Sequence, residues 1–374
     1  MRIAILTNNP LPAREGIGRH VTETARRLQA RGHRVTVLAR GPAFSGWQDA
    51  AIDGLHVRRY PHTPLKPLHH AIDRLPLQRW LDAGADGADV IHLHLPLFPP
   101  LRCRQPRIVT VHTPMLADNA AIAEPGLHPK LARLNARLFS RGYEQWHLDH
   151  AAAVLAVSER VRDEIHAGYR TQGRGIEVIE NGVDADHFAF APLPGRGRDI
   201  LYAGRLSYRK GVVRLVEAFA RLGGRPRLVI AGEGPLEPQI RQRIAELGLG
   251  DRVELAGFLD RQPLRDRLQA AAMFVSPSDY EGFPLTLLEA MAAGAPVVST
   301  RTGPLATGDT GLPVLAVDAG VDSLAAGMAE LLADPRAAAD RAIAARRVIE
   351  ERYGWDRVVD RLEAAYREPA RAAA

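Results

Sequence analysis

Two carboxylates, Glu281 and Glu289, lie eight positions apart where the sequence pattern changes from strand to helix. The apolar run Met273–Ser278 predicts the strand, Gly294 the end of the helix, and Pro296–Thr300 the next buried strand. Glu281 is then expected at the crest of the loop, and Glu289 about one turn into the helix. A helix N-terminus at the carboxyl end of a parallel strand binds anions readily. This arrangement indicates a ligand that carries both phosphate and hydroxyl groups, as a nucleotide-sugar does.

Two cations are expected at the same edge of the sheet. Arg205 follows the predicted strand Asp199–Ala203, and Lys210 precedes a predicted helix. Arginine can bind phosphate through two parallel hydrogen bonds, whereas lysine acts as a point charge. Both would stabilise the negative charge that grows on a departing diphosphate. The sequence shows no Asp-x-Asp at the end of a predicted strand to hold Mg²⁺, so we expect no metal ion and no cofactor.

The segment from Glu281 to Val298 resembles the E-x7-E signature of the retaining glycosyltransferases with the GT-B fold, in particular glycosyltransferase family 4 (glycosyl transferases group 1). Further motifs of that family occur at their usual places: Gly16-Ile-Gly18, Arg31-Gly-His33, Asn181-Gly-Val-Asp184, Gly204-Arg-Leu-Ser-Tyr-Arg-Lys210-Gly, Ala231-Gly-Glu-Gly-Pro235 and Tyr353-Gly-Trp355. Because these motifs span nearly the whole chain in the family's order, the set is far more specific than any one of them.

The resemblance implies a role for each matching residue. The residue at Glu281 reaches hydroxyls of the donor sugar, and the residue at Glu289 accepts hydrogen bonds from the nucleotide ribose. Without the motifs, Glu281 would be interpreted as a helix-start residue and Glu289 as a solvated one. A glycosidase pair finds no support, because Glu289 lies inside a helix and points where the helix dictates.

The diphosphate is expected to lie on the loop before this helix. Backbone amides of Phe283, Leu285 and Thr286 would hold it, while Pro284, often a glycine in the family, has no N–H to donate. The donor contacts that the resemblance implies are Gly16, Gly18, Arg205, Lys210, Gly232, Phe258, Glu281, Phe283, Leu285, Thr286 and Glu289; the catalytic residues are Glu281, His112, Arg205 and Lys210.

Histidines close two of the predicted strands. His112 lies at the end of Arg107–Thr113 and, by resemblance, touches the donor sugar. His92 and His94 share one face of the strand Asp89–His94. Their spacing can bind a metal, but no third ligand is evident, so a packed pair is the favoured interpretation.

Gly16-Ile-Gly18 follows the first strand after a loop of about ten residues and lacks the third glycine of a dinucleotide fingerprint. We interpret it as a mobile loop whose Gly18 backbone approaches the donor; a plain helix N-terminus is the alternative.

Basic residues recur at helical spacing between residues 130 and 146, beside an apolar and aromatic stripe. The basic positions are Lys130, Arg133, Arg137 and Arg141. Such a helix can lie on an anionic membrane surface, or it can cover the first domain with a solvated basic face. The membrane interpretation would favour a lipid-linked acceptor.

Short apolar runs alternate with helical patterns throughout the chain, which is typical of parallel sheets with crossover helices. We therefore expect an α/β protein of two doubly wound Rossmann-like domains that face a cleft. The domains should meet near Phe190–Arg198, where proline and glycine cluster. Residues 1–190 would form the acceptor-side domain and residues 191–352 the nucleotide-sugar-binding domain. A last helix should run from Trp355 to about Glu368 and end at Pro369, and the resemblance places residues 353–374 on the first domain.

Composition sets further limits. The chain has 374 residues, a net charge of +6 that lies mostly in its first half, and a single cysteine, Cys103. One cysteine excludes an internal disulfide and a cysteine-based metal cluster. No apolar run could span a bilayer and no signal-peptide pattern precedes the first strand, so we expect a cytoplasmic protein. The membrane interpretation of the basic helix would place it peripherally on the inner face of the cell membrane.

Together these observations predict a retaining, metal-independent glycosyltransferase. It would move a hexose from a UDP- or GDP-linked donor to a hydroxyl of a glycan, a lipid-linked or a small-molecule acceptor. The alternatives are a nucleotide-sugar epimerase or hydrolase of the same architecture and a non-catalytic sugar-nucleotide binding protein. No nucleic-acid partner is expected.

Overall fold

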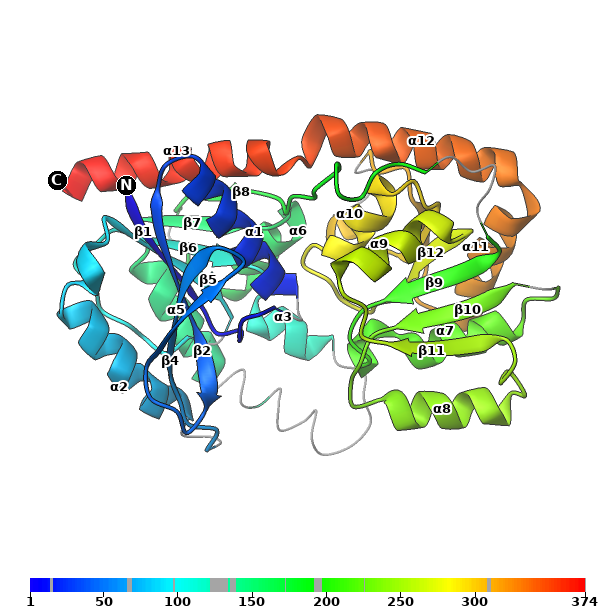
Figure 1. Ribbon diagram of the computed structural model, residues 1–374, viewed down its shortest axis with the longest axis horizontal. Helices are drawn as coiled ribbons and strands as arrows, with labels where there is room; N and C mark the ends of the chain where they lie inside the picture. The colour runs from blue at the N-terminus through cyan, green and yellow to red at the C-terminus, as the bar shows by residue number, and fades with distance from the viewer. Residues whose placement is uncertain are drawn as a thin grey trace. The chain divides into compact units, whose positions relative to one another are not determined.

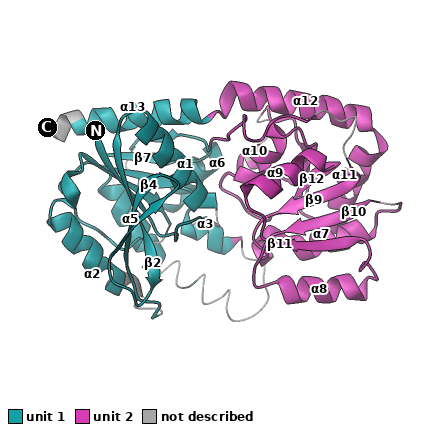
Figure 2. Cartoon of the chain, viewed as in Figure 1, with its two compact units in different colours: residues 1–120, 126–181, 355–374 teal, residues 121–125, 182–354 magenta. Residues whose placement is uncertain are grey.

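A computed structural model describes residues 1–13, 16–65, 69–96, 98–121, 134, 139–171, 173–191, 197–224, 226–307 and 311–373. The chain divides into two compact units (Figure 2). Unit 1 comprises residues 1–120, 126–181 and 355–374, and unit 2 comprises residues 121–125 and 182–354. The sequence predicts that the first domain ends at residue 190, whereas in the structure residues 182–190 already belong to unit 2. The Arg346 guanidinium holds them there by donating hydrogen bonds to the carbonyl oxygens of Ala185 and Phe188.

Unit 1 is built on an eight-stranded sheet (Figure 1) with the order β3-β4-β2-β1-β5-β6-β7-β8. Its strands are β1 (Arg2–Thr7), β2 (Arg34–Ala43), β3 (Gln48–Ile52), β4 (Leu55–His62), β5 (Val90–Leu95), β6 (Arg107–Val111), β7 (Ala153–Ala156) and β8 (Ile176–Val178). Only the β3–β4 pair is antiparallel among these described strands. The helices of the unit are α1 (Gly16–Ala30), α2 (His69–Asp82), α3 (Met115–Ala120), α5 (Arg141–Asp149), α6 (Glu159–Gly168) and α13 (Trp355–Ala373).

Unit 2 is built on a six-stranded parallel sheet with the order β11-β10-β9-β12-β13-β14. Its strands are β9 (Asp199–Ala203), β10 (Arg227–Ala231), β11 (Val253–Gly257), β12 (Met273–Ser276), β13 (Val297–Thr300) and β14 (Leu315–Val317). Its helices are α7 (Val212–Ala220), α8 (Glu237–Glu246), α9 (Arg261–Ala270), α10 (Leu285–Ala292), α11 (Val321–Ala333) and α12 (Pro335–Arg352), and a 3₁₀ turn, η3 (Tyr208–Lys210), precedes α7.

Both units therefore have the Rossmann-like parallel sheet that the sequence predicts. In each sheet the strand order reverses beside a central strand, β1 in unit 1 and β9 in unit 2, and ligands of such folds bind at the carboxyl ends of the strands near that point. Strands β3, β8 and β14 were not expected, because they are short and β3 and β14 lack buried positions. No helix in the described part of the chain is long and apolar enough to cross a membrane.

Helix α13 packs on α1 and completes unit 1 (Figure 1). Val359, Leu362 and Tyr366 of α13 are buried in the same core as Val21 and Leu28 of α1. Helix α13 continues to Ala373 with Pro369 inside it, so the expected stop at this proline was wrong. A proline this close to the end removes only one of the last hydrogen bonds of the helix, which the final turn tolerates.

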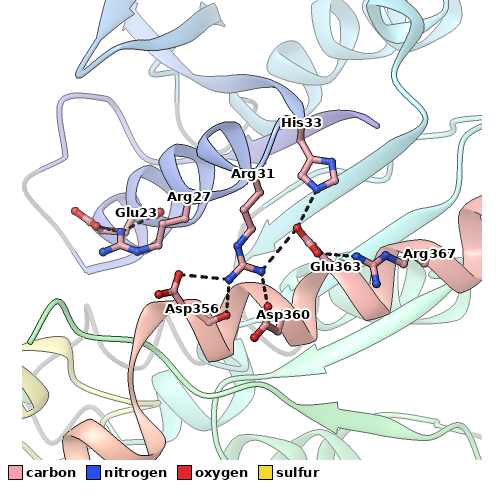
Figure 3. Close-up of polar contacts among 8 residues, drawn as sticks. All are labelled: Glu23, Arg27, Arg31, His33, Asp356, Asp360, Glu363 and Arg367. Carbon is pink, nitrogen blue, oxygen red and sulfur yellow. Dashed lines mark hydrogen bonds and ion pairs between the residues drawn. The ribbon is translucent and has the colours of Figure 1, made fainter.

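Charged side chains flank this apolar contact (Figure 3). Arg31, just after α1, donates to Asp360 at 2.5 Å and lies 3.3 Å from Asp356 and 3.8 Å from Glu363. His33 pairs with Glu363 at 3.0 Å. The Arg31-Gly-His33 motif thus joins α1 to the C-terminal helix.

The buried contacts should stabilise α13 more than the charged ones. The Tyr366 hydroxyl hydrogen-bonds Nδ1 of His92 at 2.7 Å, and both side chains are fully buried. Tyr366→Phe leaves that nitrogen without a partner and should lower the free energy of unfolding of unit 1 by about 1–3 kcal/mol. Arg31→Gln should cost at most about 1 kcal/mol, because Asp356 and Asp360 are 90% and 68% exposed.

Urea unfolding of both variants at low and high salt checks this expectation. Added salt should shrink the effect of Arg31→Gln and leave that of Tyr366→Phe unchanged. A larger loss for Arg31→Gln than for Tyr366→Phe would contradict it.

Candidate active site

Glu281 is the centre of a polar cluster in unit 2. Its Oε1 accepts hydrogen bonds from Nζ of Lys210 at 2.5 Å and from Oγ of Ser278 at 2.7 Å. Burial alone would raise the pKa of Glu281, but the pKa lies below its usual value because the charges of Lys210 and Arg209 and the two hydrogen bonds favour the carboxylate. The structure therefore brings together two of the four residues for which the sequence predicts a catalytic role, and keeps Glu281 ionised.

Two loops position this pair. The Asp279 amide donates to the Arg209 carbonyl at 2.7 Å, and Arg214 of α7 binds the Pro277 carbonyl at 2.7 Å and the Asp279 carboxylate at 2.6 Å. Gly211 lies between the loops with φ +64°, and a Cβ there would come within 2.1 Å of the Pro277 carbonyl oxygen. Only glycine allows this approach, which fixes the distance from Lys210 to Glu281.

A second loop contact supports the first. The Leu206 amide donates to the Glu233 carbonyl, and the Gly204 amide donates to the Ala231 carbonyl, both at 2.9 Å. Gly232 has φ +145°, and a Cβ on it would lie 1.9 Å from the Gly204 carbonyl oxygen. The motifs that contain Gly204 and Gly232 are therefore two sides of one packed turn. Arg205 lies in this turn after β9, with its side chain exposed.

Helix α10 begins directly after this cluster. Pro284 is its N-cap residue with φ −74° and ψ 120°, so Leu285 and Thr286 supply the first amides of the helix. Glu289 lies one turn into α10, as predicted, and is buried rather than solvated. The interpretation of Glu289 as a solvated surface residue is thus excluded. Phe283 is buried beside Tyr353, and Phe258, after β11, is 36% exposed.

The remaining candidates belong to unit 1. Gly16 starts α1 and Gly18 is buried in its first turn, so the motif is a helix N-terminus in the structure. His112 follows β6 and is buried, with its Nε2 3.0 Å from Nδ1 of His94. Of the basic helix predicted near residues 130–146, most positions, including Lys130, Arg133 and Arg137, lie outside the described residues.

His92 and His94 do pack together, as expected, with ring centroids 4.2 Å apart. No third ligand was evident in the sequence for this pair, and the structure places two further histidines beside His94 instead. His20 of α1 lies beside His94 and His112, with ring centroids 5.3 and 5.0 Å away. The ligand nitrogens of His20, His94 and His112 all lie within 4.8 Å of one another. Sequence reasoning missed His20 because a histidine on an amphipathic helix shows no link to strands far along the chain.

Three supporting residues of unit 2 were also missed. Ser278 holds Glu281, Arg214 holds the loop, and the Thr300 hydroxyl donates to the Ser278 carbonyl at 2.5 Å. Ser278 and Thr300 each end a predicted strand, so their place at the carboxyl edge was the available signal.

Comparisons with known proteins find similar sequences and similar folds. The family described as Glycosyltransferase Family 4 matches residues 14–187, and the family described as Glycosyl transferases group 1 matches residues 184–348. A glycogen synthase of Mycobacterium tuberculosis is 30% identical, over 94% of this chain and 90% of that protein. A sucrose-phosphate synthase from Thermosynechococcus elongatus has a similar fold, with a TM-score of 0.83, 22% identity and 99% of each chain covered. Anabaena HepE in complex with UDP-glucose has a TM-score of 0.74 and 18% identity, over 98% of this chain and 100% of that one.

Gly232 and Gly248 provide a matched test of the packed turn. Gly248 has φ +64° but nothing within 4 Å of an added Cβ, so Gly248→Ala should lower the free energy of unfolding by about 1–2 kcal/mol. Gly232→Ala adds a collision with backbone and should cost more than about 3 kcal/mol. Chemical unfolding of the purified variants measures the difference; equal losses would show that the turn can move apart.

The ion pair of Lys210 and Glu281 predicts a pH dependence. Lys210→Met leaves a buried carboxylate without its cation and should lower the free energy of unfolding by about 1–3 kcal/mol at pH 7. In the wild type, the pKa of Glu281 is lowered, so its contribution is complete above the unfolded value of about 4.3 and disappears as the pH falls through the lower, folded value. The loss caused by Lys210→Met should therefore shrink once the pH falls below about 4.3, toward the folded value.

Arg241→Met is the control, because its ion pair with Glu237 lies on the surface with side chains 61% and 35% exposed. Its effect should be small and nearly independent of pH. A Lys210→Met effect that stays constant from neutral to acidic pH would contradict the ionised pair.

Proposed function

We propose that this chain, which belongs to glycosyltransferase family 4, transfers a hexose from a UDP- or GDP-linked donor to an acceptor hydroxyl with retention of the anomeric configuration. The chain is a glycosyltransferase that takes its sugar from a nucleotide-sugar. The hexose, the UDP or GDP carrier, the acceptor hydroxyl and the retention of configuration are proposed. The observation that carries it is the buried pair of Lys210 and Glu281 beside the start of α10.

The donor diphosphate is proposed to bind at this start. The first amides of α10 at Leu285 and Thr286 point toward it, and the positive end of the helix dipole favours an anion. Lys210 provides a nearby cation, and Arg205 provides a second from the adjoining turn. Glu289 would accept the ribose hydroxyls, in the way that carboxylates do in dinucleotide sites.

Glu281 is proposed to hold the sugar. Both of its hydrogen bonds from Lys210 and Ser278 fall on Oε1, which leaves Oε2 for a sugar hydroxyl. A lowered pKa keeps Glu281 an acceptor of hydrogen bonds rather than an acid. It would therefore orient the sugar and fix Lys210 against the phosphate, rather than transfer a proton.

The transfer step then needs no metal ion. The bond between the anomeric carbon and the diphosphate oxygen breaks, and the negative charge that develops on that oxygen is stabilised by Lys210, Arg205 and the amides of α10. The acceptor oxygen attacks the anomeric carbon from the face that the diphosphate leaves, and its proton passes to the departing phosphate. Retention follows from attack on this same face, without a covalent intermediate on a protein side chain.

The Anabaena structure holds UDP-glucose, which favours a UDP-linked hexose as the first donor to test. The proposed acceptor is a hydroxyl of a glycan, a lipid-linked carrier or a small molecule. His112 is proposed to touch the outer hydroxyls of the donor sugar.

A two-step assay tests the activity. Nucleotide-sugars are first screened for a rise in melting temperature, because a ligand that binds only the native state stabilises it. The best donor is then incubated with a panel of acceptors, and nucleoside diphosphate release is followed with and without chelator. Release should require an acceptor and be unaffected by the chelator. Glu281→Gln should lower turnover about 100-fold or more with the donor still bound.

Arg241→Gln is the control variant and should keep full activity, since its charge lies on the surface of α8. Release that proceeds equally well without acceptor would favour an epimerase or hydrolase. Donor binding without any release across the panel would favour a binding protein. Full activity of Glu281→Gln would exclude the proposed site.

A further inference from the structure

We propose that His20, His94 and His112 form a binding site for a divalent transition metal of the zinc class inside unit 1. The three histidines come from the first helix and from the ends of two neighbouring strands, α1, β5 and β6. All three histidines belong to unit 1, whereas the polar cluster around Glu281 belongs to unit 2.

The spacing of the nitrogens suits such an ion. Zinc bound by imidazole has Zn–N distances of about 2.0–2.1 Å, so two ligand nitrogens of a tetrahedral site lie about 3.3 Å apart. Nδ1 of His94 and Nε2 of His112 are hydrogen-bonded at 3.0 Å, and one nitrogen from each of the three rings lies within 4.8 Å of the others. A shift of about 1.5 Å by the His20 ring would close the site, which a side-chain rotation can supply.

Unsatisfied nitrogens point to a missing partner. Among the described residues, Nε2 of His94 makes no hydrogen bond, and it and both ring nitrogens of His20 are inaccessible to solvent. A buried polar atom without a partner costs about 1–3 kcal/mol, and such atoms are rare in native interiors. A coordinated ion would give one nitrogen of each ring a partner.

The rings are in the form that binds metals. Burial lowers the pKa of His20 to about 4, although Asn181 opposes this, and it lowers the pKa of His94 and His112 well below the usual value. All three imidazoles are therefore neutral at pH 7 and have lone pairs to donate. His92 is not a fourth ligand, because its nitrogens are occupied by Tyr366 and Thr110; its ring packs against that of His94 at a tilt of 41°.

The donor set selects the kind of ion. Three imidazole nitrogens with no carboxylate in the cluster suit Zn²⁺, Co²⁺, Ni²⁺ or Cu²⁺ and disfavour Mg²⁺ and Ca²⁺, which prefer oxygen. Three ligands leave a fourth position for water.

Metal binding would also affect the reaction. His112 cannot contact a sugar hydroxyl through a nitrogen that binds a metal, so an occupied site would inhibit transfer. This consequence rests on the proposed function, whereas the site itself does not.

Direct metal binding to the full chain tests the site without any assay of transfer. Chelator-treated protein is titrated with Zn²⁺ in competition with a chromophoric chelator, and then with Co²⁺, whose visible spectrum distinguishes four from six ligands. We expect one tight equivalent per chain and a four-coordinate Co²⁺ spectrum. His20→Gln and His94→Gln should each weaken binding by roughly tenfold or more. His166→Gln, at an exposed histidine bonded to Thr171, is the matched control and should bind like the wild type.

X-ray absorption of the wild-type zinc complex decides the question even if the variants do not fold. The first shell should contain three imidazole nitrogens at about 2.0–2.1 Å. A shell made of oxygen alone, or His20→Gln and His94→Gln variants that fold and bind zinc as tightly as the wild type, would show that the three histidines are only packed together. If zinc binds but does not inhibit transfer, the metal site stands and only the proposed contact between His112 and the donor sugar is contradicted.

Discussion

The Glu281 carboxylate is buried, and burial by itself favours the neutral acid. The ammonium of Lys210, 2.5 Å away, reverses that preference, and Ser278 adds a hydrogen bond to the same oxygen. Neither partner of the ion pair could be removed without leaving a charge that is poorly solvated. The surrounding backbone is arranged around this requirement. Gly211 lets one loop contact another, and Arg214 ties the second loop to α7.

This pair also explains why glycines and cations occur in the same short motifs. Lys210 can reach Glu281 only if the turn after β9 lies against the loop after β12, and Gly232 allows the neighbouring loop after β10 to pack below that turn. The backbone contacts make the positions of the side chains rigid before any ligand arrives. A rigid arrangement of charges costs little reorganisation during a reaction, which is the usual source of electrostatic catalysis.

The sequence predicted the repeating parts of the structure well. Apolar runs identified the long buried strands, and the position of Glu289 one turn into α10 followed from the distance between the strand and Gly294. Short strands such as β3 and β14 lacked an apolar signal, and Pro369 near the end of α13 did not stop the helix. Pattern alone cannot say how a proline near a helix terminus balances against the packing of the preceding turns.

The sequence predicted the charged residues of the candidate site, but not the residues that hold them in place. Glu281 and Lys210 were expected at one sheet edge because parallel strands end together there, and the structure brings them into contact. Ser278 and Thr300 were missed because a hydroxyl at a strand end is common, and His20 because its contacts join α1 to strands that lie far along the chain. Contacts of this kind depend on tertiary structure and leave no local periodicity.

Unit 1 is discontinuous in the sequence, since α13 follows the whole of unit 2. During synthesis, the β-sheet of unit 1 would emerge from the ribosome with the apolar surface that α13 later covers still exposed to water. Residues 182–354 of unit 2 are continuous and can complete their own core while the apolar surface of unit 1 is still uncovered. The order of maturation would then be the reverse of the order of synthesis, and Trp355, Val359 and Leu362 would complete the core of the part of the chain that was made first.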